Sequence, residues 1–280
     1  MSVAADIERE LARLRCARAD GHPPELRTST MTHLAWVPSR WLAEARATLA
    51  GMEERHPART ILLVPEARRR DGVAATVDVR EFELPGMATE VTSEIVEVRL
   101  RGRVAQHPAS IVLPLLVSDL PVFCRWRGRP DFDSTALDEI VGVVDRLVVD
   151  SAEWRGLPRP YRGLLPRFDR VAVSDVAYRR GLPWRARLAE RWPEIRSIST
   201  LRVVGPRADA LLLVGWLRSR LRRRVGLVHR PAPSIESVAV DGEAVERPLV
   251  AQASPSDLLS AELEALGRDP VYEAAVARAL

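Results

Sequence analysis

The sequence predicts an α/β protein, with a layered, mostly parallel sheet in an N-terminal domain and a smaller α+β domain after it. Over residues 25–152, short apolar runs typical of strands alternate with segments whose apolar residues recur at helical spacing. Prolines and glycines crowd between residues 155 and 170, and a second alternation begins after Pro193. We therefore expect an N-terminal helix in 1–24, an α/β domain over 25–152, an irregular or helical connection over 153–195 and an α+β C-terminal domain over 196–280.

In the N-terminal part, apolar residues at helical spacing predict a first helix that ends before the breaker at 21–24. The strands expected next cover 30–37, 61–64, 96–100, 122–126 and 147–150. The continuous apolar run at 61–64 is typical of a strand buried on both faces, whereas the alternation of apolar and charged residues at 96–101 predicts one wet face. The helices expected between these strands cover 41–52 after a Ser39 cap, 105–116 with a kink at Pro114, and 137–144.

In the C-terminal part, Trp184, Leu188 and Trp192 lie four residues apart and predict one face of a helix that Pro183 introduces. The elements expected after it are strands at 197–204 and 225–229, a helix at 208–224, a hairpin at 238–245 that turns at Asp241–Gly242, and helices at 257–266 and 270–280. Ser254 is a natural N-cap because Pro255 follows it at the first helical position.

The composition is that of an ordinary globular protein, with 46% hydrophobic and 29% charged residues. No lysine occurs, so arginine supplies every basic side chain, and the net charge of +4 is small for this length. We therefore expect no nucleic-acid partner. The apolar run at 210–217 is too short for a membrane span, the N-terminus has no signal-peptide core, and two cysteines suit a reducing compartment. These features predict a cytoplasmic protein with no membrane partner.

Patterns that carry catalysis or cofactor binding are missing from the sequence. The glycines stand apart, whereas a phosphate-binding loop needs them closely spaced, and the histidines lack metal-ligand spacing. Ser151 has no nucleophile elbow around it, so Asp150 and Ser151 are expected to form a turn or helix cap. Cys124 lies in an apolar strand, where a thiol is usually inert. We expect no catalytic residue, no cofactor and no metal.

Tryptophan beside arginine is the composition of binding hot spots, and it marks two candidate partner-binding segments. They are Arg125–Trp126–Arg127 and Trp184–Arg185. The alternative is that both tryptophans are buried in the core, since tryptophan is seldom fully exposed. A basic run at 218–224 follows a predicted helix, where it is either a solvated helix end or a surface for an acidic partner.

Several segments resemble the OpcA family in order and spacing. They are RTSTMT (27–32), HPART (56–60), DLPVFCRWRG (119–128), RLVVDSAEW (146–154), VSDVAYRRGLPWR (173–185), ALLLVGWL (210–217) and the C-terminal stretch 254–276. The resemblance implies a non-catalytic protein that assembles or allosterically activates its partner, glucose-6-phosphate dehydrogenase. In photosynthetic members of the family, the effect on the dehydrogenase is sensitive to redox state through cysteines. The strand at 91–100 has no cysteine here, so Cys16 and Cys124 are not expected to act as a switch.

An alternative function is a sugar-phosphate- or nucleotide-binding regulator or enzyme of central carbon metabolism. It depends on Arg27, Thr28, Ser29 and Thr30, whose side chains can hydrogen-bond a phosphate at the start of a strand. The same residues can instead simply cap the sheet edge. A nucleic-acid binder is the third possibility, and its binding would fall with added salt.

Overall fold

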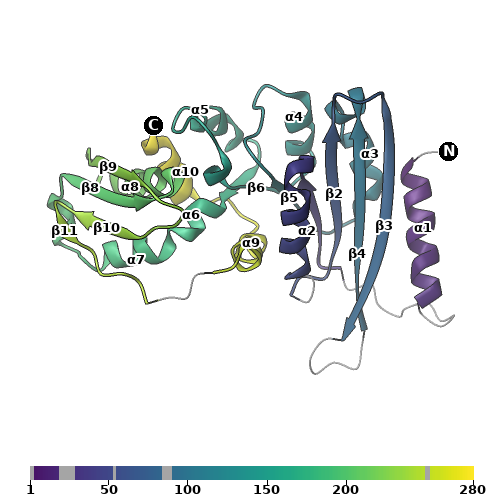
Figure 1. Ribbon diagram of the computed structural model, residues 1–280, viewed down its shortest axis with the longest axis horizontal. Coiled ribbons are helices and arrows are strands. Elements are labelled where there is room, and N and C mark those ends of the chain that lie inside the picture. Colours follow the sequence, from purple (N-terminus) through teal and green to yellow (C-terminus); the bar gives the residue numbers. More distant parts are fainter. Residues whose placement is uncertain (1–2, 19–28, 53–54, 84–89, 250–252) are drawn as a thin grey trace. The chain divides into compact units, whose positions relative to one another are not determined.

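The computed structural model describes residues 3–18, 29–52, 55–83, 90–249 and 253–280 (Figure 1). The chain divides into two compact units, Met1–Leu147 and Val148–Leu280. The domain limits expected from the sequence stay a prediction. None of the helices within the described ranges is long and apolar enough to cross a membrane.

The larger sheet has seven strands in the order β3-β4-β2-β1-β5-β6-β7, which confirms the predicted mostly parallel α/β fold. The strands are β1 (Met31–Trp36), β2 (Ala58–Glu66), β3 (Gly72–Glu83), β4 (Glu90–Arg101), β5 (Val122–Trp126), β6 (Arg146–Val149) and β7 (Ala172–Asp175). In the first unit, β1 pairs in parallel with β2 on one side and with β5 on the other, and β2 pairs in parallel with β4. Strand β3 runs antiparallel to its neighbour, β4.

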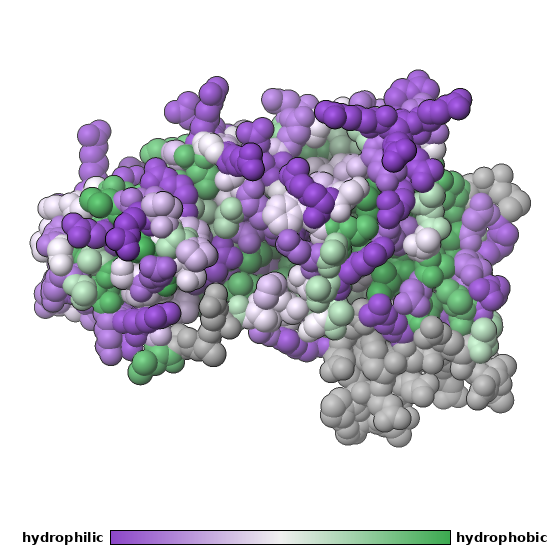
Figure 2. All heavy atoms as spheres, viewed as in Figure 1, coloured by the Kyte–Doolittle hydropathy of each residue, from purple (hydrophilic) through white to green (hydrophobic). Residues whose placement is uncertain are grey.

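Helices cover the sheet of the first unit because their apolar residues recur at helical spacing. Helix α2 (Leu42–Ala50) buries Leu42, Ala45 and Leu49 against apolar residues of β1 and β2. Helix α1 (Val3–Arg18) packs beside β3 at the edge of the sheet, and in Figure 1 α2 runs lengthwise along the strands, next to β2. Figure 2 shows apolar side chains gathered over the outer strands of this sheet.

A buried arginine ties α1 to the sheet. Arg59, on β2, is 3% exposed, and its Nε donates to Glu94 of β4 at 2.6 Å. Its Nη1 donates to the carbonyl of Leu115 at 2.9 Å and to Glu8 of α1. Arg15 of α1 forms an ion pair with the same Glu94. Because a buried charge is costly unless it is paired, these contacts fix α1 against β2 and β4.

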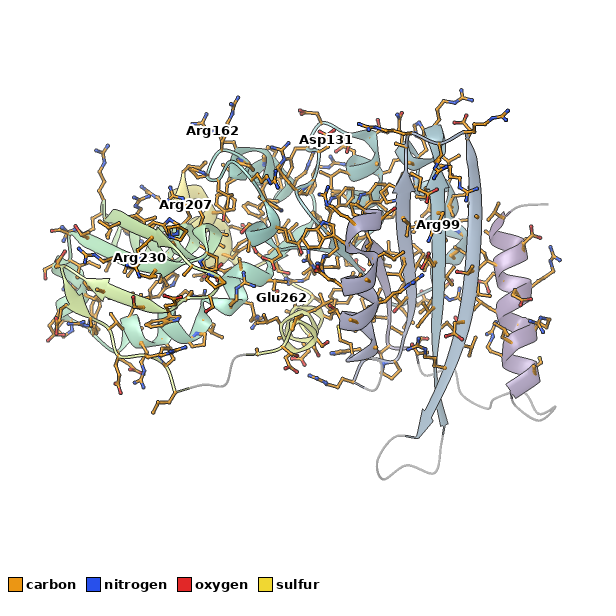
Figure 3. All side chains as sticks on the ribbon, in the orientation of Figure 1. Arg99, Asp131, Arg162, Arg207, Arg230 and Glu262 are labelled. Atoms are coloured by element: carbon orange, nitrogen blue, oxygen red, sulfur yellow. The ribbon has the colours of Figure 1, made fainter. Side chains whose placement is uncertain are left out.

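Three predictions for the first unit are corrected by the structure. The single helix expected at 105–116 is three short turns, η2 (Gly102–Gln106), α3 (Ala109–Val112) and η3 (Leu113–Leu115), because Pro108 and Pro114 lack the amide hydrogen that a continuous helix needs. Ser39 is not a cap: it begins the 3₁₀ turn η1 (Ser39–Trp41), which has no side-chain cap. The expected wet face of β4 is partly buried, since Glu97 pairs with Arg46 and with Arg99, which is labelled on the sheet in Figure 3.

Two further elements in the first unit differ from the predictions, one strand that was not expected and one helix that begins earlier. Strand β3 has no counterpart in the sequence predictions, although Val77 and Val79 alternate with Asp78 and Arg80 there. Helix α4 (Thr135–Val141) begins two residues before the predicted 137, because the hydroxyl of Ser134 accepts a hydrogen bond from the Leu137 amide at 3.3 Å.

The second unit contains a four-stranded sheet in the order β11-β10-β8-β9. Its elements are η4 (Ser151–Glu153), α5 (Tyr161–Leu164), η5 (Leu165–Arg167), α6 (Val176–Arg180), α7 (Leu182–Ala189), η6 (Glu194–Ser197), β8 (Thr200–Gly205), α8 (Arg207–Leu221), β9 (Gly226–Pro231), β10 (Ser237–Val240), β11 (Glu243–Ala244), α9 (Pro255–Leu263) and α10 (Pro270–Ala279). The segment 153–195, expected to be irregular or helical, therefore holds strand β7 as well as helices. Apolar residues of α7, α8, β8 and β10 form one core cluster.

Two predictions of local structure in the second unit are confirmed, and one is wrong in part. The cap at Ser254 is confirmed as a capping box with Asp257, and the two-residue hairpin turn is confirmed by positive φ at Asp241 and Gly242. The face expected for α7 holds Trp184 and Leu188, which are buried. Trp192 lies beyond the end of α7 and is 60% exposed, so its place on that face was wrong.

Helices α8 and α10 approach closely at Gly215. A Cβ atom added there would lie 2.2 Å from the carbonyl oxygen of Ala275 on α10. Only a residue without a side chain therefore fits between the two backbones.

We expect Gly215→Ala to lower the free energy of unfolding by at least about 1–3 kcal/mol, the usual range for overpacking. Urea denaturation measures the change. Gly267→Ala is the matched control, because an added Cβ there meets nothing within 4 Å. Equal urea midpoints for the two variants would show that α8 and α10 are not held this close.

Candidate functional site

The order of the strands in the first unit reverses at β1. The chain passes from β1 to β2 on one side, while β5 occupies the other side. In open parallel sheets, ligands bind beyond the carboxyl ends of the strands at such a reversal. Here those carboxyl ends are Trp36 and Trp126, which makes this end of the sheet the first candidate site.

Stacked tryptophans close the carboxyl ends of β1 and β5. Trp36 and Trp126 are register partners, and their rings stack with centroids 4.6 Å apart at an interplanar angle of 12°. Both are buried, and the Arg127 amide donates to the Trp36 carbonyl at 2.9 Å. Stacking of this kind contributes about 0.5–1.5 kcal/mol beyond burial. The pair forms a rigid floor for whatever lies beyond the strands.

Two arginines lie against a third tryptophan, Trp41, which follows β1 in the turn η1. The Arg127 guanidinium lies 4.6 Å from the ring centroid of Trp41 and donates to Glu44 at 2.8 Å. Arg40 approaches the same ring at 5.9 Å, and the Trp41 Nε1 is buried without a hydrogen-bond partner in the described chain. Arg40 and Arg129 are exposed. The arrangement offers cationic groups on a rigid aromatic base, which suits carboxylates of a partner.

Four of the five residues predicted for partner binding are buried. Arg125 donates from Nη1 to the carbonyl of Trp126 at 2.6 Å, and Trp126 stacks as above. Trp184 belongs to the core of the second unit, and Arg185 lies 3.6 Å from the ring centroid of Tyr178. Arg127 is half-buried, with 10% of its side chain exposed. Their role in binding stays a prediction, and the two segments belong to different units.

The residues proposed for the alternative phosphate site are only partly described. Arg27 and Thr28 lie outside the described residues. The Thr30 hydroxyl donates to the carbonyl of Pro57 at 3.2 Å, as expected of a residue that fixes the sheet edge. Phosphate binding there, with Ser29 as the remaining member, stays a prediction.

Three carboxylates and an arginine form a buried polar cluster in the second unit. Arg180 donates from Nε to Asp209 at 2.8 Å, and its Nη2 lies 3.4 Å from Asp150. Asp175 ends β7 and caps α6, because its Oδ1 accepts from the amides of Ala177 at 2.9 Å and Ser151 at 3.1 Å. Burial first, and then the charge of Asp150, raise the pKa of Asp175 to about 7, although the hydrogen bonds from Ser151 and Ala177 act to lower it.

Ser151 belongs to this cluster as a structural residue. Its hydroxyl lies 3.0 Å from the hydroxyl of Tyr161, whose pKa burial raises well above its ordinary value, so Tyr161 stays protonated and does not take up a proton from Ser151. The side chain of Asp150 accepts from the Ala152 amide at 3.0 Å, which confirms the predicted turn. The cluster is built to hold β7, α6 and η4 together.

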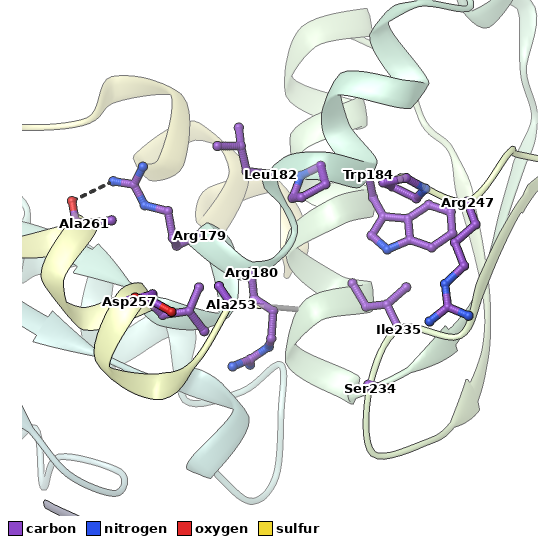
Figure 4. Close-up of a pocket in the computed structure, with 13 residues that line it drawn as sticks. Arg179, Arg180, Leu182, Trp184, Ser234, Ile235, Arg247, Ala253, Asp257 and Ala261 are labelled. Carbon is purple, nitrogen blue, oxygen red and sulfur yellow. Dashed lines mark hydrogen bonds between the residues drawn. The ribbon is translucent and has the colours of Figure 1, made fainter. Parts of the chain in front are cut away.

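A pocket of about 310 Å³ lies beside the buried cluster (Figure 4). Its lining residues are Arg179, Arg180, Leu182, Pro183, Trp184, Ser234, Ile235, Arg247, Pro248, Ala253, Asp257, Leu258 and Ala261. Sequence reasoning missed this pocket, because its walls come from segments as far apart as α6 and α9. The adjacent pair Arg179–Arg180 is the only local signal, and it resembles any solvated helix end.

Burial shifts the pKa values of one cysteine and one histidine in the first unit. Cys124 is buried, and burial raises the pKa of its thiol to about 12, whereas Cys16 is exposed. The buried imidazole of His33 has its pKa lowered to about 4, chiefly by burial. In the described part of the chain, no cluster of histidine, cysteine and acidic residues has the geometry of a metal site.

Comparison with known proteins finds a family match and two distant relatives. Residues 50–165 match the model of the glucose-6-phosphate dehydrogenase subunit N-terminal domain, the OpcA assembly family. Proteins named "Putative OxPP cycle protein OpcA" from Nostoc punctiforme and Synechocystis are each 26% identical, over 182 and 181 residues. Each alignment covers 60% of this chain and 38% of the relative, so the chain matches little more than a third of their length.

We expect Asp175→Asn to flatten the pH dependence of stability. With a folded pKa of about 7 and an unfolded pKa near 4, the folded wild type binds more protons between these values. Its free energy of unfolding therefore falls as pH rises from about 4 to 7, by up to about 1.4 kcal/mol per unit. Asparagine does not ionise, and its oxygen still accepts from the two amides.

Urea denaturation at several pH values measures this difference. The matched control is Asp169→Asn, an exposed aspartate of the same unit, which should follow the wild-type curve. Parallel curves for wild type and Asp175→Asn would contradict the account of the buried carboxyl.

Proposed function

Residues 50–165 belong to the OpcA family, and on that premise we propose that this protein binds glucose-6-phosphate dehydrogenase and favours its assembled, active state. The family match is the observation that carries the proposal, and the resemblance of the quoted segments supports it. An effector of this kind works only by binding one state of the dehydrogenase more tightly than another. The gain in activity is then limited by that difference in affinity.

We propose further that the protein has no catalytic activity of its own. Two side chains that could act as nucleophiles, Ser151 and Cys124, have structural positions in the described chain. Ser151 is fixed in a turn against Tyr161, and the thiol of Cys124 is buried with a pKa of about 12. Both observations support a role in binding, with chemistry left to the dehydrogenase.

The docking surface proposed here is the carboxyl end of β1 and β5. Its floor is the Trp36–Trp126 stack, and its rim carries Arg40, Arg127 and Arg129. Arginine forks onto carboxylates, and arginine with tryptophan is the composition of energetic hot spots. In this proposal Trp126 shapes the surface and the exposed arginines make the contacts. The Trp184–Arg185 segment then acts through the stability of the second unit.

A double variant tests this surface. Arg40→Ala with Arg129→Ala should keep the melting temperature within about 2 °C, because exposed changes usually cost under ~0.5 kcal/mol. It should weaken dehydrogenase binding by tenfold or more, about 1.4 kcal/mol. Titration against immobilised dehydrogenase measures the affinity.

Arg9→Ala is the matched control, since Arg9 is an exposed arginine on α1, beside β3 at the sheet edge. Wild-type affinity in the double variant would exclude this surface and direct attention to the basic helix end at 218–224. No binding by the wild type itself would instead refute the proposed function.

We expect activation of the dehydrogenase to be insensitive to redox state. Cys124 is buried and its raised thiol pKa leaves almost no thiolate, the form that reacts. The variant Cys16→Ser/Cys124→Ala should activate the dehydrogenase as well as wild type does, with and without oxidant. The enzyme alone, under the same conditions, is the control. A response to oxidant that either substitution abolishes would refute this expectation.

A further inference from the structure

The pocket of the second unit has an apolar wall that the side chains of the described residues leave open. Trp184 lies on one side with Ile235, and Ala261 of α9 lies on the other (Figure 4). Leu258 of α9 also lines the pocket. Leu182, at the start of α7, also lines the pocket although 47% of it is exposed to solvent. The volume of about 310 Å³ falls at the lower end of the range for small-molecule sites, about 300–1,000 Å³.

Within the part of the chain that the structure describes, some of the arginines that line the pocket form ion pairs and one does not. Arg179 donates to Glu262 at 2.6 Å, and Arg180 is held by Asp209 and Asp150. Arg247 is exposed, and among the described residues it makes no ion pair. Asp257 of α9 forms the capping box with Ser254 and keeps its negative charge, on the opposite side of the pocket from Arg247 (Figure 4). Arg247, on the side of Trp184, is therefore the cationic group of the lining that an anionic ligand can reach without displacing a carboxylate.

These features select a class of ligand. A sugar phosphate needs many hydrogen-bond partners for its hydroxyl groups, and Ser234 is the one hydroxyl in the lining. A polyphosphate needs several free cations, yet Arg179 and Arg180 already hold carboxylates. An aromatic body with a single negative charge fits both the apolar wall and the unneutralised Arg247.

We propose that this pocket binds a small aromatic or amphipathic organic monoanion. The apolar body of the ligand lies against Trp184, Ile235 and Leu258, and its acidic group pairs with Arg247. This inference goes beyond the proposed function, and the experiment below uses the protein alone, so failure of one leaves the other untouched.

A pair of fluorescent probes separates the apolar and ionic parts of the site. 8-Anilinonaphthalene-1-sulfonate carries one negative charge, and N-phenyl-1-naphthylamine is its uncharged counterpart. Both should bind the folded wild-type protein saturably. Arg247→Gln should weaken the sulfonate at least fivefold and change the neutral probe less than twofold. Arg162→Gln is the matched control, because Arg162 is an exposed arginine on α5 that points away from the unit (Figure 3).

Two further variants test the apolar wall. Ala261→Phe places a ring in the pocket and should weaken both probes at least tenfold. Leu182→Ala removes an exposed apolar residue, so it keeps the fold even if Ala261→Phe does not, and it should weaken both probes about threefold. Melting curves establish that each variant is folded.

Three results would overturn the inference. The first is no saturable binding of either probe to wild type. The second is unchanged binding of both probes to folded Ala261→Phe and to Leu182→Ala, which would place the probes elsewhere. The third is equal weakening of the charged and neutral probes by Arg247→Gln, which would remove the ionic contact.

Discussion

Parallel pairing of β1 on both of its edges is the constraint on which the first unit depends. A parallel neighbour requires a crossover, so the chain returns through α2 before β2 and through longer segments before β5. The two carboxyl ends then meet in register, which brings Trp36 beside Trp126 although 90 positions separate them along the chain. The cluster of Arg40, Trp41 and Arg127 exists only because those strands are neighbours.

Arginine is the only strong cation in this protein, and its planar fork suits the buried positions that it occupies. Arg59 joins β2, β4, α1 and the Leu115 carbonyl of η3, and Arg180 joins two aspartates. Each of these pairings contributes more to stability than an exposed ion pair does, because removing one partner would leave a buried charge uncompensated. Arg40, Arg129 and Arg247 are exposed, and these are the arginines assigned here to binding other molecules.

Features set by neighbours in the chain could be predicted from the sequence. Strand β5 has the predicted bounds 122–126, and the Ser254 cap and the Asp241–Gly242 turn depend on local chemistry. Features set by distant segments could not be predicted. Whether Trp126 is a floor or an exposed anchor depends on Trp36, and the pocket needs α6, α7, α9 and residues 234–248 together. One helix was expected at 105–116, with a kink at Pro114. The structure has three short turns there, because Pro108 and Pro114 both interrupt the hydrogen bonding of a helix.

The central claim is that this protein acts by binding glucose-6-phosphate dehydrogenase, without chemistry of its own. Sedimentation of the purified dehydrogenase with increasing amounts of this protein, with NADPH formation measured on the same samples, tests it most directly. The account predicts a larger complex whose population rises together with dehydrogenase activity, and no NADPH formation by this protein alone. Unchanged sedimentation and activity at saturating protein, or turnover without the dehydrogenase, would contradict it.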